Sequence, residues 1–403
     1  MRIVYLHQYF NTPDMKGGTR SYEMARRLVS QGHEVDLITS DRSERTTGGW
    51  HETVEAGIRV HWYPVPYSNE ACFKERLRAF LTFAWVASRK ASSLKGDVIF
   101  ATSTPLTIAL PGLYASWRKD VPFVFEVRDL WPELPIAIGA LKNPVLIQLT
   151  RQLEYIAYHS ASQVVALSPG MKEGIVRRDY PAENVHVIPN SSDIDLFSNG
   201  ARACFRAPYD WLEDRPLVVY TGTLGQINGV VYFAELASHV WRCDPEVRFL
   251  IMGSGKQEDV VRAKAHELGV LNKNLFMMPP VEKNKVPDVL DAATMATSLF
   301  IDLKEMWANS ANKFFDALAS GTPVAINYGG WQADILNQSG AGIVMPARDT
   351  EAAAEQLVQK LRDKEWIDEA GKKARQLAVE RFNREKLVVQ LESVLLKAVR
   401  GNQ

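Results

Sequence analysis

Short apolar runs alternate with longer amphipathic stretches in the first half of the chain. Strand-like runs rich in β-branched and aromatic residues cover 2–6, 34–39, 58–63, 97–101, 122–127 and 163–167. Apolar residues recur at helical spacing over 19–31, 77–93, 105–119 and 144–160. Strands that alternate with helices predict a parallel sheet covered by helices on both faces.

The same alternation restarts near residue 215, without a close repeat of the sequence. Strand-like runs follow at 216–221, 247–252, 275–278, 296–300, 323–327 and 343–345, with helical patterns at 229–242, 257–268, 312–319 and 350–362. Residues 366–398 are rich in helix formers and keep helical spacing. The pattern predicts an α/β protein with two Rossmann-like domains.

Turn-forming residues separate the two units, at 187–193 and again at 207–216. Two open α/β sheets have one natural ligand site, the crevice that faces the carboxyl ends of both sets of strands. We expect the following division: an N-terminal domain over 1–190, a linker over 191–214, a C-terminal domain over 215–380, and a C-terminal helix over 381–403 that could cross back to the first domain.

Composition and charge narrow the function classes. A chain of 403 residues usually forms two or three domains. Lys and Arg number 47, as do Asp and Glu, so no global field attracts nucleic acid. Cys72, Cys204 and Cys243 are far apart and form no CxxC pair, which argues against a disulfide framework or a zinc site. With neither a signal-peptide pattern nor an apolar run of about 20 residues, the chain is predicted to be cytoplasmic.

Glycine-rich loops precede a predicted helix in both domains. Gly17 and Gly18 follow the first strand, and residues 222–225 follow the strand at 216–221. Backbone N–H groups in such a loop can approach a phosphate at a helix N-terminus. A tight turn explains either loop taken singly, and neither loop is a GxGxxG dinucleotide fingerprint.

Residues 310–324 form the most informative stretch, with the pattern of a loop, a short helix, a glycine stop and a buried strand. Lys313 and Asp316 are three residues apart and share one helical face. The ammonium could neutralise a diphosphate, and the carboxylate could accept two hydrogen bonds from a ribose diol. A surface ion pair between the two side chains would explain the same spacing.

Three charged residues stand at the carboxyl end of the strand at 122–127: Glu126, Arg128 and Asp129. Charges on an otherwise apolar strand are costly unless they are paired or used. They predict either an ion pair between Arg128 and a nearby carboxylate, or a general base or sugar-orienting group at the floor of the crevice.

Two further segments have alternative interpretations. Asp193 and Asp195 have the DxD spacing that can hold a divalent metal, but we expect them to cap a turn and to bind no metal. Residues 73–95 place apolar side chains at helical spacing among Lys and Arg residues, a pattern that suits an anionic membrane surface. A core helix with solvated charges explains that segment at least as well, and both interpretations can hold together.

In their order along the chain, these motifs resemble the family 4 retaining glycosyltransferases of the GT-B fold, over nearly the whole length. The element at 128–132 is similar to the N-acetyl-L-fucosaminyl transferase branch of bacterial surface-polysaccharide synthesis. The residues that carry the resemblance are Gly17, Gly18, Thr19, Arg20, Glu23, Ala25, Leu28 and 32–35; Pro189, Asn190, Asp193 and Phe197; 222–225 and Gly229; and 253–255 and 316–324.

The resemblance implies two Rossmann-like domains that face each other across a cleft, and a retaining, hexosyltransferase-type enzyme. The enzyme would move a sugar, such as an N-acetylated amino sugar, from a UDP-linked donor to a glycan or lipid-linked acceptor in lipopolysaccharide or other surface-polysaccharide synthesis. The nucleotide sugar is the co-substrate, and no cofactor, metal or nucleic acid is implied. Peripheral contact with the inner membrane surface through 73–95 is compatible with this activity.

The candidate site residues fall into three groups. The catalytic candidates are Asp129, Lys313 and Arg128. The donor-binding candidates are Gly222, Thr223, Gly225, Gly253, Ser254, Gly255, Asn309, Ser310, Asn312 and Asp316. The acceptor-side candidates are Tyr9, Gly17, Gly18, Arg20 and Glu133.

The chain also departs from the family pattern. Arg128 stands where the family often has a histidine, so no histidine base is available at that position. Thr223 and Asn228 replace an arginine and a lysine of the phosphate loop. Of the paired glutamates, the first corresponds to Ala308 and only the second carboxylate remains. Lys313 is the substitute cation.

Two other functions fit the same architecture. A sugar-nucleotide 2-epimerase would convert the donor without any acceptor. A non-catalytic assembly partner would bind a nucleotide sugar without turning it over, or would bind none.

Overall fold

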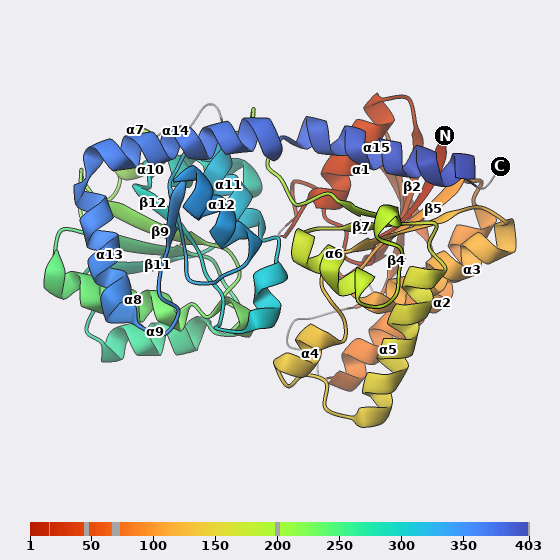
Figure 1. Ribbon diagram of the computed structural model, residues 1–403, viewed down its shortest axis with the longest axis horizontal. Coiled ribbons are helices and arrows are strands. Elements are labelled where there is room, and N and C mark those ends of the chain that lie inside the picture. The colour runs from red at the N-terminus through yellow and green to blue at the C-terminus, as the bar shows by residue number, and fades with distance from the viewer. Residues whose placement is uncertain (16, 44–47, 67–72, 198–201, 402–403) are drawn as a thin grey trace. The chain divides into compact units, whose positions relative to one another are not determined.

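The computed structural model describes the chain except for residues 16, 44–47, 67–72, 198–201 and 402–403. The chain forms two compact units, coloured along the sequence in Figure 1. Unit 1 contains Met1–Pro189 and Glu385–Gln403, and unit 2 contains Asn190–Arg384. Each unit is built on a largely or wholly parallel sheet with helices packed on it, which confirms the predicted fold class of two Rossmann-like α/β domains.

Unit 1 has an eight-stranded sheet in the order β3-β4-β2-β1-β5-β6-β7-β8, parallel except between β3 and β4. Its strands are β1 (Arg2–Leu6), β2 (Glu34–Asp41), β3 (His51–Glu55), β4 (Ile58–Pro64), β5 (Val98–Thr102), β6 (Phe123–Val127), β7 (Gln163–Ala166) and β8 (Val185–Val187). Its helices are α1 (Arg20–Ser30), α2 (Phe73–Ser93), α3 (Ala109–Lys119), α4 (Glu133–Ala137), α5 (Pro144–His159), α6 (Pro169–Val176) and α15 (Arg384–Gly401), with the 3₁₀ turns η1 (Leu106–Ile108) and η2 (Ala182–Asn184).

Unit 2 has a six-stranded parallel sheet in the order β11-β10-β9-β12-β13-β14. Its strands are β9 (Leu217–Thr221), β10 (Arg248–Met252), β11 (Leu275–Met278), β12 (Met295–Ser298), β13 (Val324–Ile326) and β14 (Gly342–Val344). Its helices are α7 (Arg202–Arg206), α8 (Val231–Cys243), α9 (Glu258–Glu267), α10 (Val286–Ala292), α11 (Asn312–Ser320), α12 (Trp331–Ser339), α13 (Thr350–Arg362) and α14 (Lys364–Arg381), with the 3₁₀ turns η3 (Gln226–Asn228), η4 (Lys283–Lys285) and η5 (Lys304–Ala308).

Two strands lie outside the sequence prediction. β3 alternates half-buried and exposed side chains and pairs with β4 through a turn at Ala56 and Gly57, which both have positive φ. Because β3 is a polar edge strand, it lacks the apolar run that marks the buried strands. β8 has only three residues and lies just before the turn formers that predict the domain boundary.

The boundaries also differ from the expected ones. Residues 191–214, predicted as a linker, group with unit 2. There α7 packs against α10, and the Arg206 guanidinium donates to the carbonyl of Ala292 at 2.6 and 3.0 Å. The helical stretch 366–398 forms two helices, α14 and α15, and the break between them contains Phe382, which is buried against the rings of Phe315 and Trp331.

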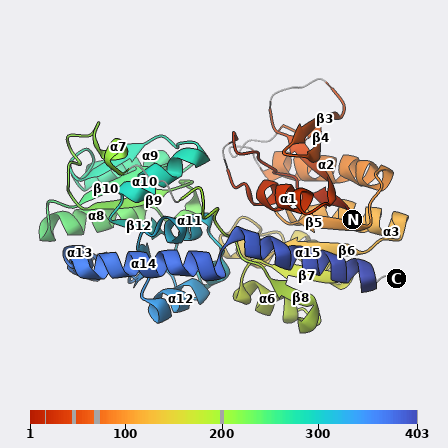
Figure 2. The ribbon, with the colours of Figure 1, turned by 90° about the horizontal axis from the view of Figure 1, so that it is seen from above.

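The last helix belongs to the core of unit 1. Val388, Leu391 and Leu395 of α15 are fully buried in one cluster with residues of β1 and α1. Seen from above, α15 lies beside α1 (Figure 2). At the edge of this contact Arg27 forms an ion pair with Glu385, and Nε2 of His33 lies 2.7 Å from the carboxylate of Glu392. The helix therefore completes a hydrophobic core that begins at the other end of the sequence.

Two composition-based expectations can be located in the structure. Cys204 and Cys243 are free and exposed, and Cys72 lies outside the described residues. Among the helices that the structure describes, none combines the length and the apolar character that crossing a bilayer requires.

Candidate active site

In unit 2, two glycine loops meet at the carboxyl edge of the sheet. The first loop, 222–225, follows β9, and the second, 253–255, follows β10, its neighbour in the sheet. The Gly222 N–H donates to the carbonyl of Met252 at 3.0 Å, and the Leu224 N–H donates to the carbonyl of Ser254 at 2.9 Å. The backbones of the two loops are therefore in direct contact.

This contact explains two of the glycines. A Cβ atom on Gly253 would lie 1.9 Å from the carbonyl oxygen of Gly222, and one on Gly255 would lie 2.6 Å from that of Leu224. Side chains at either position would force the loops apart. A Cβ atom on Gly225, by contrast, would make only an ordinary contact, 3.8 Å from the Thr223 methyl group. Gly222, Thr223, Ser254 and Gly255 remain exposed at this edge.

Lys313 lies beside the first loop. It stands in the first turn of α11, and its ammonium donates to the Tyr220 hydroxyl at 2.8 Å and lies 4.2 Å from the centre of the Tyr220 ring. A Cβ on Gly222 would be 3.6 Å from Nζ of Lys313. No carboxylate in the described chain lies within ion-pairing distance of Lys313, and burial lowers the pKa of its amine to about 7. The edge of the sheet thus carries a cation without a counter-ion.

Asp316 has other partners than Lys313. The Asp316 carboxylate accepts hydrogen bonds from the hydroxyl of Ser192 and from the ammonium of Lys283, and it is buried. The ion pair between Lys313 and Asp316 that would explain their spacing is therefore absent. Lys283 is a residue that sequence reasoning missed, because it lies 33 residues before Asp316 and the pattern of η4 carries no signal.

The loop before α11 is fixed by hydrogen bonds. The Asn190 N–H donates to the Ser310 hydroxyl at 3.0 Å, and the Asn190 side-chain amide donates to the Ser310 carbonyl at 2.5 Å. The Asn309 side chain accepts from the Ala311 N–H at 3.1 Å, and Asn312 is the first residue of α11. These residues position the start of the helix that carries Lys313.

In unit 1, the candidate acceptor residues divide into two kinds. Arg20 is buried, and its guanidinium donates to Glu126 at 2.8 and 3.1 Å and to the carbonyls of Ile188 and Pro189 at 2.9 and 2.7 Å. Burial acts to raise the pKa of the Glu126 carboxyl, but the charge and hydrogen bonds of Arg20 outweigh burial and hold that pKa below its usual value. Arg20 thus ties α1 to β6 and to the residues that follow β8, and its contact with an acceptor stays a prediction.

Glu133 is likewise engaged within unit 1. Its carboxylate pairs with Arg178, which also pairs with the buried Glu154 at 3.0 Å. Burial, and then the charge of Glu133, raise the pKa of Glu154 to about 7. The structure therefore places Glu133 in an ion-pair network that joins α4 and α5 to the residues after α6, and its contact with an acceptor stays a prediction.

Gly17 and Gly18 belong to a loop closed by Asn11. The Asn11 amide donates to the carbonyl of Gly18 at 3.2 Å, and the Arg42 guanidinium donates to the Asn11 carbonyl oxygen. Gly17 has a φ of 128°, and a Cβ there would lie 2.7 Å from the Asn11 amide nitrogen. The Arg42 guanidinium lies over the ring of Tyr9, with its central carbon 5.9 Å from the centre of that ring.

Arg128 and Asp129 follow β6 and are partly exposed to solvent. The Arg128 N–H donates to the Ser103 hydroxyl at 2.8 Å, and its guanidinium donates to Nε2 of His7 at 3.3 Å. The Asp129 carboxylate accepts from the Thr104 hydroxyl at 3.0 Å, and loss of hydration raises the pKa of Asp129. The segment after β6 thus presents a guanidinium and a carboxyl group on consecutive residues, both bonded to the segment after β5 through Ser103 and Thr104.

His7 and Gln8 are polar residues that sequence reasoning missed. They follow β1 directly and are buried, with His7 Nδ1 and both ends of the Gln8 amide unpaired among the described residues. Burial, followed by the charges of Arg128 and Arg42, lowers the pKa of His7 well below its usual value, so its imidazole is neutral. Their position after the central strand was the available signal, because the carboxyl edge of a parallel sheet is where ligands bind.

The DxD residues follow the break between the two units. Asp193 lies 3.9 Å from the Arg384 guanidinium. Within the part of the chain that the structure describes, no three His, Cys, Asp or Glu side chains come together as metal ligands would.

Family models match both units. Residues 17–191 match the glycosyl transferase 4-like domain, and residues 215–363 match the glycosyl transferases group 1 model. A putative colanic acid biosynthesis glycosyl transferase, WcaI of Escherichia coli K12, is 25% identical over 68% of this chain and 70% of its own. The N-acetyl-alpha-D-glucosaminyl L-malate synthase of Bacillus anthracis is 20% identical over 96% of this chain and 95% of its own.

Solved structures share the fold over almost the full length. HepE of Anabaena, in complex with UDP and glucose, has a TM-score of 0.73 and 16% identity, covering 98% of this chain and 100% of its own. The sucrose-phosphate synthase of Thermosynechococcus elongatus has a TM-score of 0.78 and 16% identity, covering 99% of both chains. The protein is thus a glycosyltransferase of the GT-B class, with two Rossmann-like domains. Within that class it belongs to glycosyltransferase family 4.

Proposed function

We propose that the enzyme transfers a sugar, with retention of anomeric configuration, from a UDP-linked donor to a glycan or lipid-linked acceptor in surface-polysaccharide synthesis. The bound UDP of the HepE structure supports the choice of nucleotide. The colanic acid name of WcaI and the N-acetylglucosaminyl name of the Bacillus relative support a surface polysaccharide and an N-acetylated amino sugar. The N-acetyl-L-fucosaminyl branch is the subfamily that we propose, and the cytoplasm is the compartment.

The observation that carries this proposal is the uncompensated cation of unit 2. Lys313 lies beside a glycine loop at the carboxyl edge of the sheet, has no ion-pair partner in the described chain, and has a pKa lowered by burial. A buried amine without a counter-ion is unfavourable unless a ligand supplies the negative charge. A diphosphate is such a ligand, and the remaining N–H groups of the loop, those of Thr223 and Gly225, would add hydrogen bonds to it.

The donor residues then take separate roles. Lys313 and the loop at 222–225 would stabilise the charge that grows on the leaving diphosphate. Asp316 would hold the ribose, with Lys283 orienting its carboxylate, and the loop at 253–255 would border the base. Asn309, Ser310 and Asn312 would fix the start of α11. No step in this assignment requires a metal.

The chemistry follows from these roles. The bond between the anomeric carbon and the diphosphate oxygen breaks, and the acceptor hydroxyl attacks the same face of the sugar. The proton of that hydroxyl passes to the leaving phosphate oxygen. Because the hydroxyl attacks the face from which the phosphate leaves, the configuration is retained without an enzymic nucleophile. Arg128 and Asp129 of unit 1 would orient the reacting sugar or the acceptor, together with Tyr9 and the loop at Gly17 and Gly18.

A thermal-shift screen of nucleotide sugars tests this function directly. UDP-sugars should raise the unfolding temperature, since a ligand at a hundred times its Kd stabilises the folded form by about 2.7 kcal/mol. ADP-, GDP- and dTDP-sugars at equal concentration serve as controls. Failure of every nucleotide sugar to shift the transition would favour the assembly-partner alternative. Conversion of the donor to its 2-epimer without an acceptor would identify an epimerase.

Binding of UDP should depend on pH through Lys313. Without a ligand the pKa of the Lys313 amine is about 7. A bound diphosphate would raise that pKa, so the enzyme takes up a proton when UDP binds. Below pH 7 the ammonium is already formed and the Kd for UDP should change little. Between pH 7 and 8.5 the protonated fraction falls, and the Kd should rise roughly tenfold.

Calorimetric titration in buffers of different ionisation enthalpy measures both the Kd and the proton uptake. The variant Lys313→Met should bind UDP more weakly and without this pH dependence. An unchanged Kd across pH 6 to 9, with no proton uptake by the unmodified enzyme, would remove Lys313 from the diphosphate site.

A further inference from the structure

Exposed apolar side chains concentrate on three neighbouring helices of unit 1. In the described chain 16 large hydrophobic residues are exposed, and nine of them lie on α2, α3 and α5. α3 packs against both α2 and α5, and Figure 1 shows the three helices together on the side of unit 1 away from α15. The nine residues are Leu81, Trp85, Leu110, Tyr114, Trp117, Val145, Leu149, Tyr155 and Ile156.

On α2 and α3 these residues form one stripe each, and on α5 Val145, Leu149 and Ile156 share one face. Leu81 and Trp85 are one turn apart on α2, whereas Phe83 between them is fully buried against the core. Leu110, Tyr114 and Trp117 repeat at intervals of four and three on α3, where Trp117 is 76% exposed. Packed helices lie about 8–10 Å apart, so stripes on adjacent helices form one broad face. We call this surface the aromatic face.

Basic residues outnumber acidic ones on two of the three helices of the aromatic face, and one of these basic residues, Lys90, pairs with Glu52. Helices α2 and α3 together carry seven Lys and Arg residues and one carboxylate, although the whole chain has 47 charges of each sign. The Arg89 guanidinium lies over the ring of Trp85, at 4.7 Å, which places a cation directly beside an exposed apolar side chain. The imbalance is therefore a property of α2 and α3, whereas α5 carries one Arg and one Glu.

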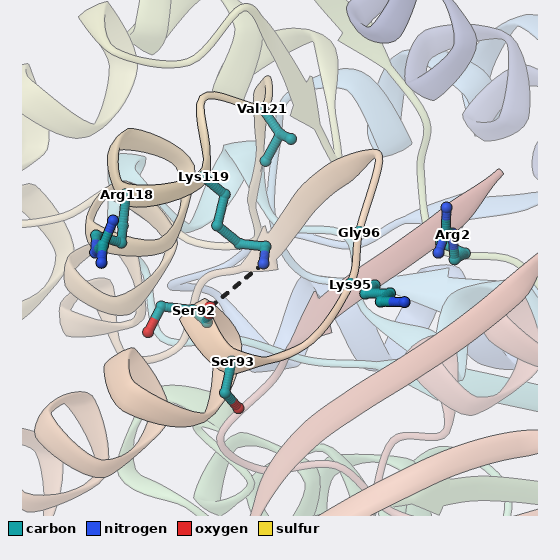
Figure 3. A pocket seen from close by; sticks show the side chains of 8 residues that line it. All are labelled: Arg2, Ser92, Ser93, Lys95, Gly96, Arg118, Lys119 and Val121. Atoms are coloured by element: carbon teal, nitrogen blue, oxygen red, sulfur yellow. Dashed lines mark hydrogen bonds between the residues drawn. The ribbon is translucent and has the colours of Figure 1, made fainter.

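A basic pocket lies where α2 and α3 end. This open pocket of about 630 Å³ is lined by Arg2, Lys95, Arg118 and Lys119, with Ser92 and Ser93 (Figure 3). Lys119 donates to the carbonyl of Ser92 at 3.3 Å, so it caps the end of α2. Lys95 and Arg118 are exposed and form no ion pair with any described carboxylate. Arg118 directly follows Trp117, so the pocket lies at the end of the helix that carries the most exposed ring.

From this combination we infer that unit 1 docks onto the surface of an anionic lipid bilayer through α2, α3 and α5. Trp and Tyr side chains favour the interfacial region of a membrane, where the ring is apolar and its N–H or O–H meets water. Lys and Arg around them attract anionic headgroups, and the basic pocket would receive a headgroup phosphate. The inference goes beyond the proposed glycosyl transfer and does not depend on the identity of donor or acceptor.

The surface is broader than the sequence predicts. The segment 73–95 supplies only one of three helices, and part of its apolar pattern faces the core, as the buried Phe83 and Ala87 show. The largest exposed ring, Trp117, and both exposed residues at the start of α5, Val145 and Leu149, lie outside that segment. A second copy of the chain could also cover this surface. In a symmetric dimer, however, two identical basic surfaces would meet and repel each other.

Flotation of the full chain with vesicles tests the inference. Vesicles of equal parts phosphatidylglycerol and phosphatidylcholine should bind the protein at low salt, and pure phosphatidylcholine vesicles should bind it far less. The double variant Trp85→Ser/Trp117→Ser should weaken binding by roughly tenfold or more, because two interfacial anchors are lost. Lys95→Gln/Arg118→Gln should weaken binding to anionic vesicles and reduce its salt dependence.

The matched control is Val260→Ser/Val389→Ser, two exposed apolar residues on α9 and α15. This variant should float with anionic vesicles as the unmodified protein does. Thermal unfolding of every variant shows that the fold is intact, which is expected for side chains at the surface. Absence of binding to anionic vesicles, or undiminished binding by both double variants, would overturn the inference. A concentration-dependent dimer that Trp85→Ser/Trp117→Ser dissociates, without vesicle binding, would assign the face to a second copy.

Discussion

Replacing Lys313 with methionine should lower kcat about a hundredfold, the usual effect of removing one group that meets charge developing in a transition state. Its ammonium is held beside the loop at 222–225 by the Tyr220 hydroxyl and ring. Methionine keeps the length and the apolar contacts of the side chain but removes the charge. Steady-state kinetics with a UDP-sugar and acceptor measure the effect.

The same substitution should not lower stability. The pKa of Lys313 in the folded protein is about 7, below its ordinary value of 10.5, so folding disfavours the charged form. The unfolded chain binds more protons between pH 7 and 10, and the stability of the unmodified protein therefore rises with pH across that window. Lys313→Met removes the cost of burying a charged Lys313. The variant should therefore unfold at a higher temperature than the unmodified protein, and the difference should be largest below pH 7.

Lys264→Met is the matched control, because Lys264 is a lysine of the same unit that is paired with Glu267 at the surface. It should leave kcat and the unfolding temperature almost unchanged. Normal turnover by Lys313→Met would show that the ammonium does not meet the leaving group. A large loss of stability would show instead that Lys313 is a structural residue.

Gly253→Ala should damage both the fold of unit 2 and donor binding. The new methyl group would lie 1.9 Å from the carbonyl oxygen of Gly222, and a backbone oxygen cannot move aside as a flexible side chain can. Overpacking of this kind costs about 2–4 kcal/mol of unfolding free energy. Urea unfolding should show the loss, and UDP titration should show a weaker Kd because the two loops separate.

Gly225→Ala provides the comparison in the other of the two loops, 222–225. The nearest atoms to its new methyl group would be 3.8 and 3.9 Å away, and its φ of −100° suits any residue. Its unfolding midpoint should stay close to that of the unmodified protein. Equal midpoints for the two alanine variants would contradict the close packing of the loops.

Much of the fold was predictable because its elements are long and their periodicity is clear. The buried strands β1, β9 and β10 are continuous apolar runs, and α13 has the predicted bounds, 350–362. β3 could not be found in this way, because its exposed side chains interrupt the pattern. The division of 366–398 into two helices depends on Phe382 packing against Phe315, a contact that helical spacing does not reveal.

The candidate site was predictable in its motifs but not in its partners. The loops and Lys313 are visible as local patterns. Arg20 and Glu126 are 106 residues apart, and Asp316 meets Ser192 from 124 residues away, so no local pattern can show that these charges are satisfied. The same reason explains why Arg20 looks like a ligand-binding residue in the sequence and is buried in an ion pair in the structure.

The position of α15 has a consequence for how the protein is made. The core of unit 1 contains β1 and α1 near the start of the chain and Val388, Leu391 and Leu395 near its end. During synthesis a ribosome exposes the first 189 residues long before these side chains emerge. Until α15 is synthesised, the amino-terminal part of unit 1 has an uncovered apolar surface. Unit 2 is continuous in sequence, so all its core residues are synthesised before α15. Chaperone binding during translation is thus expected at the surface of unit 1 that α15 finally covers.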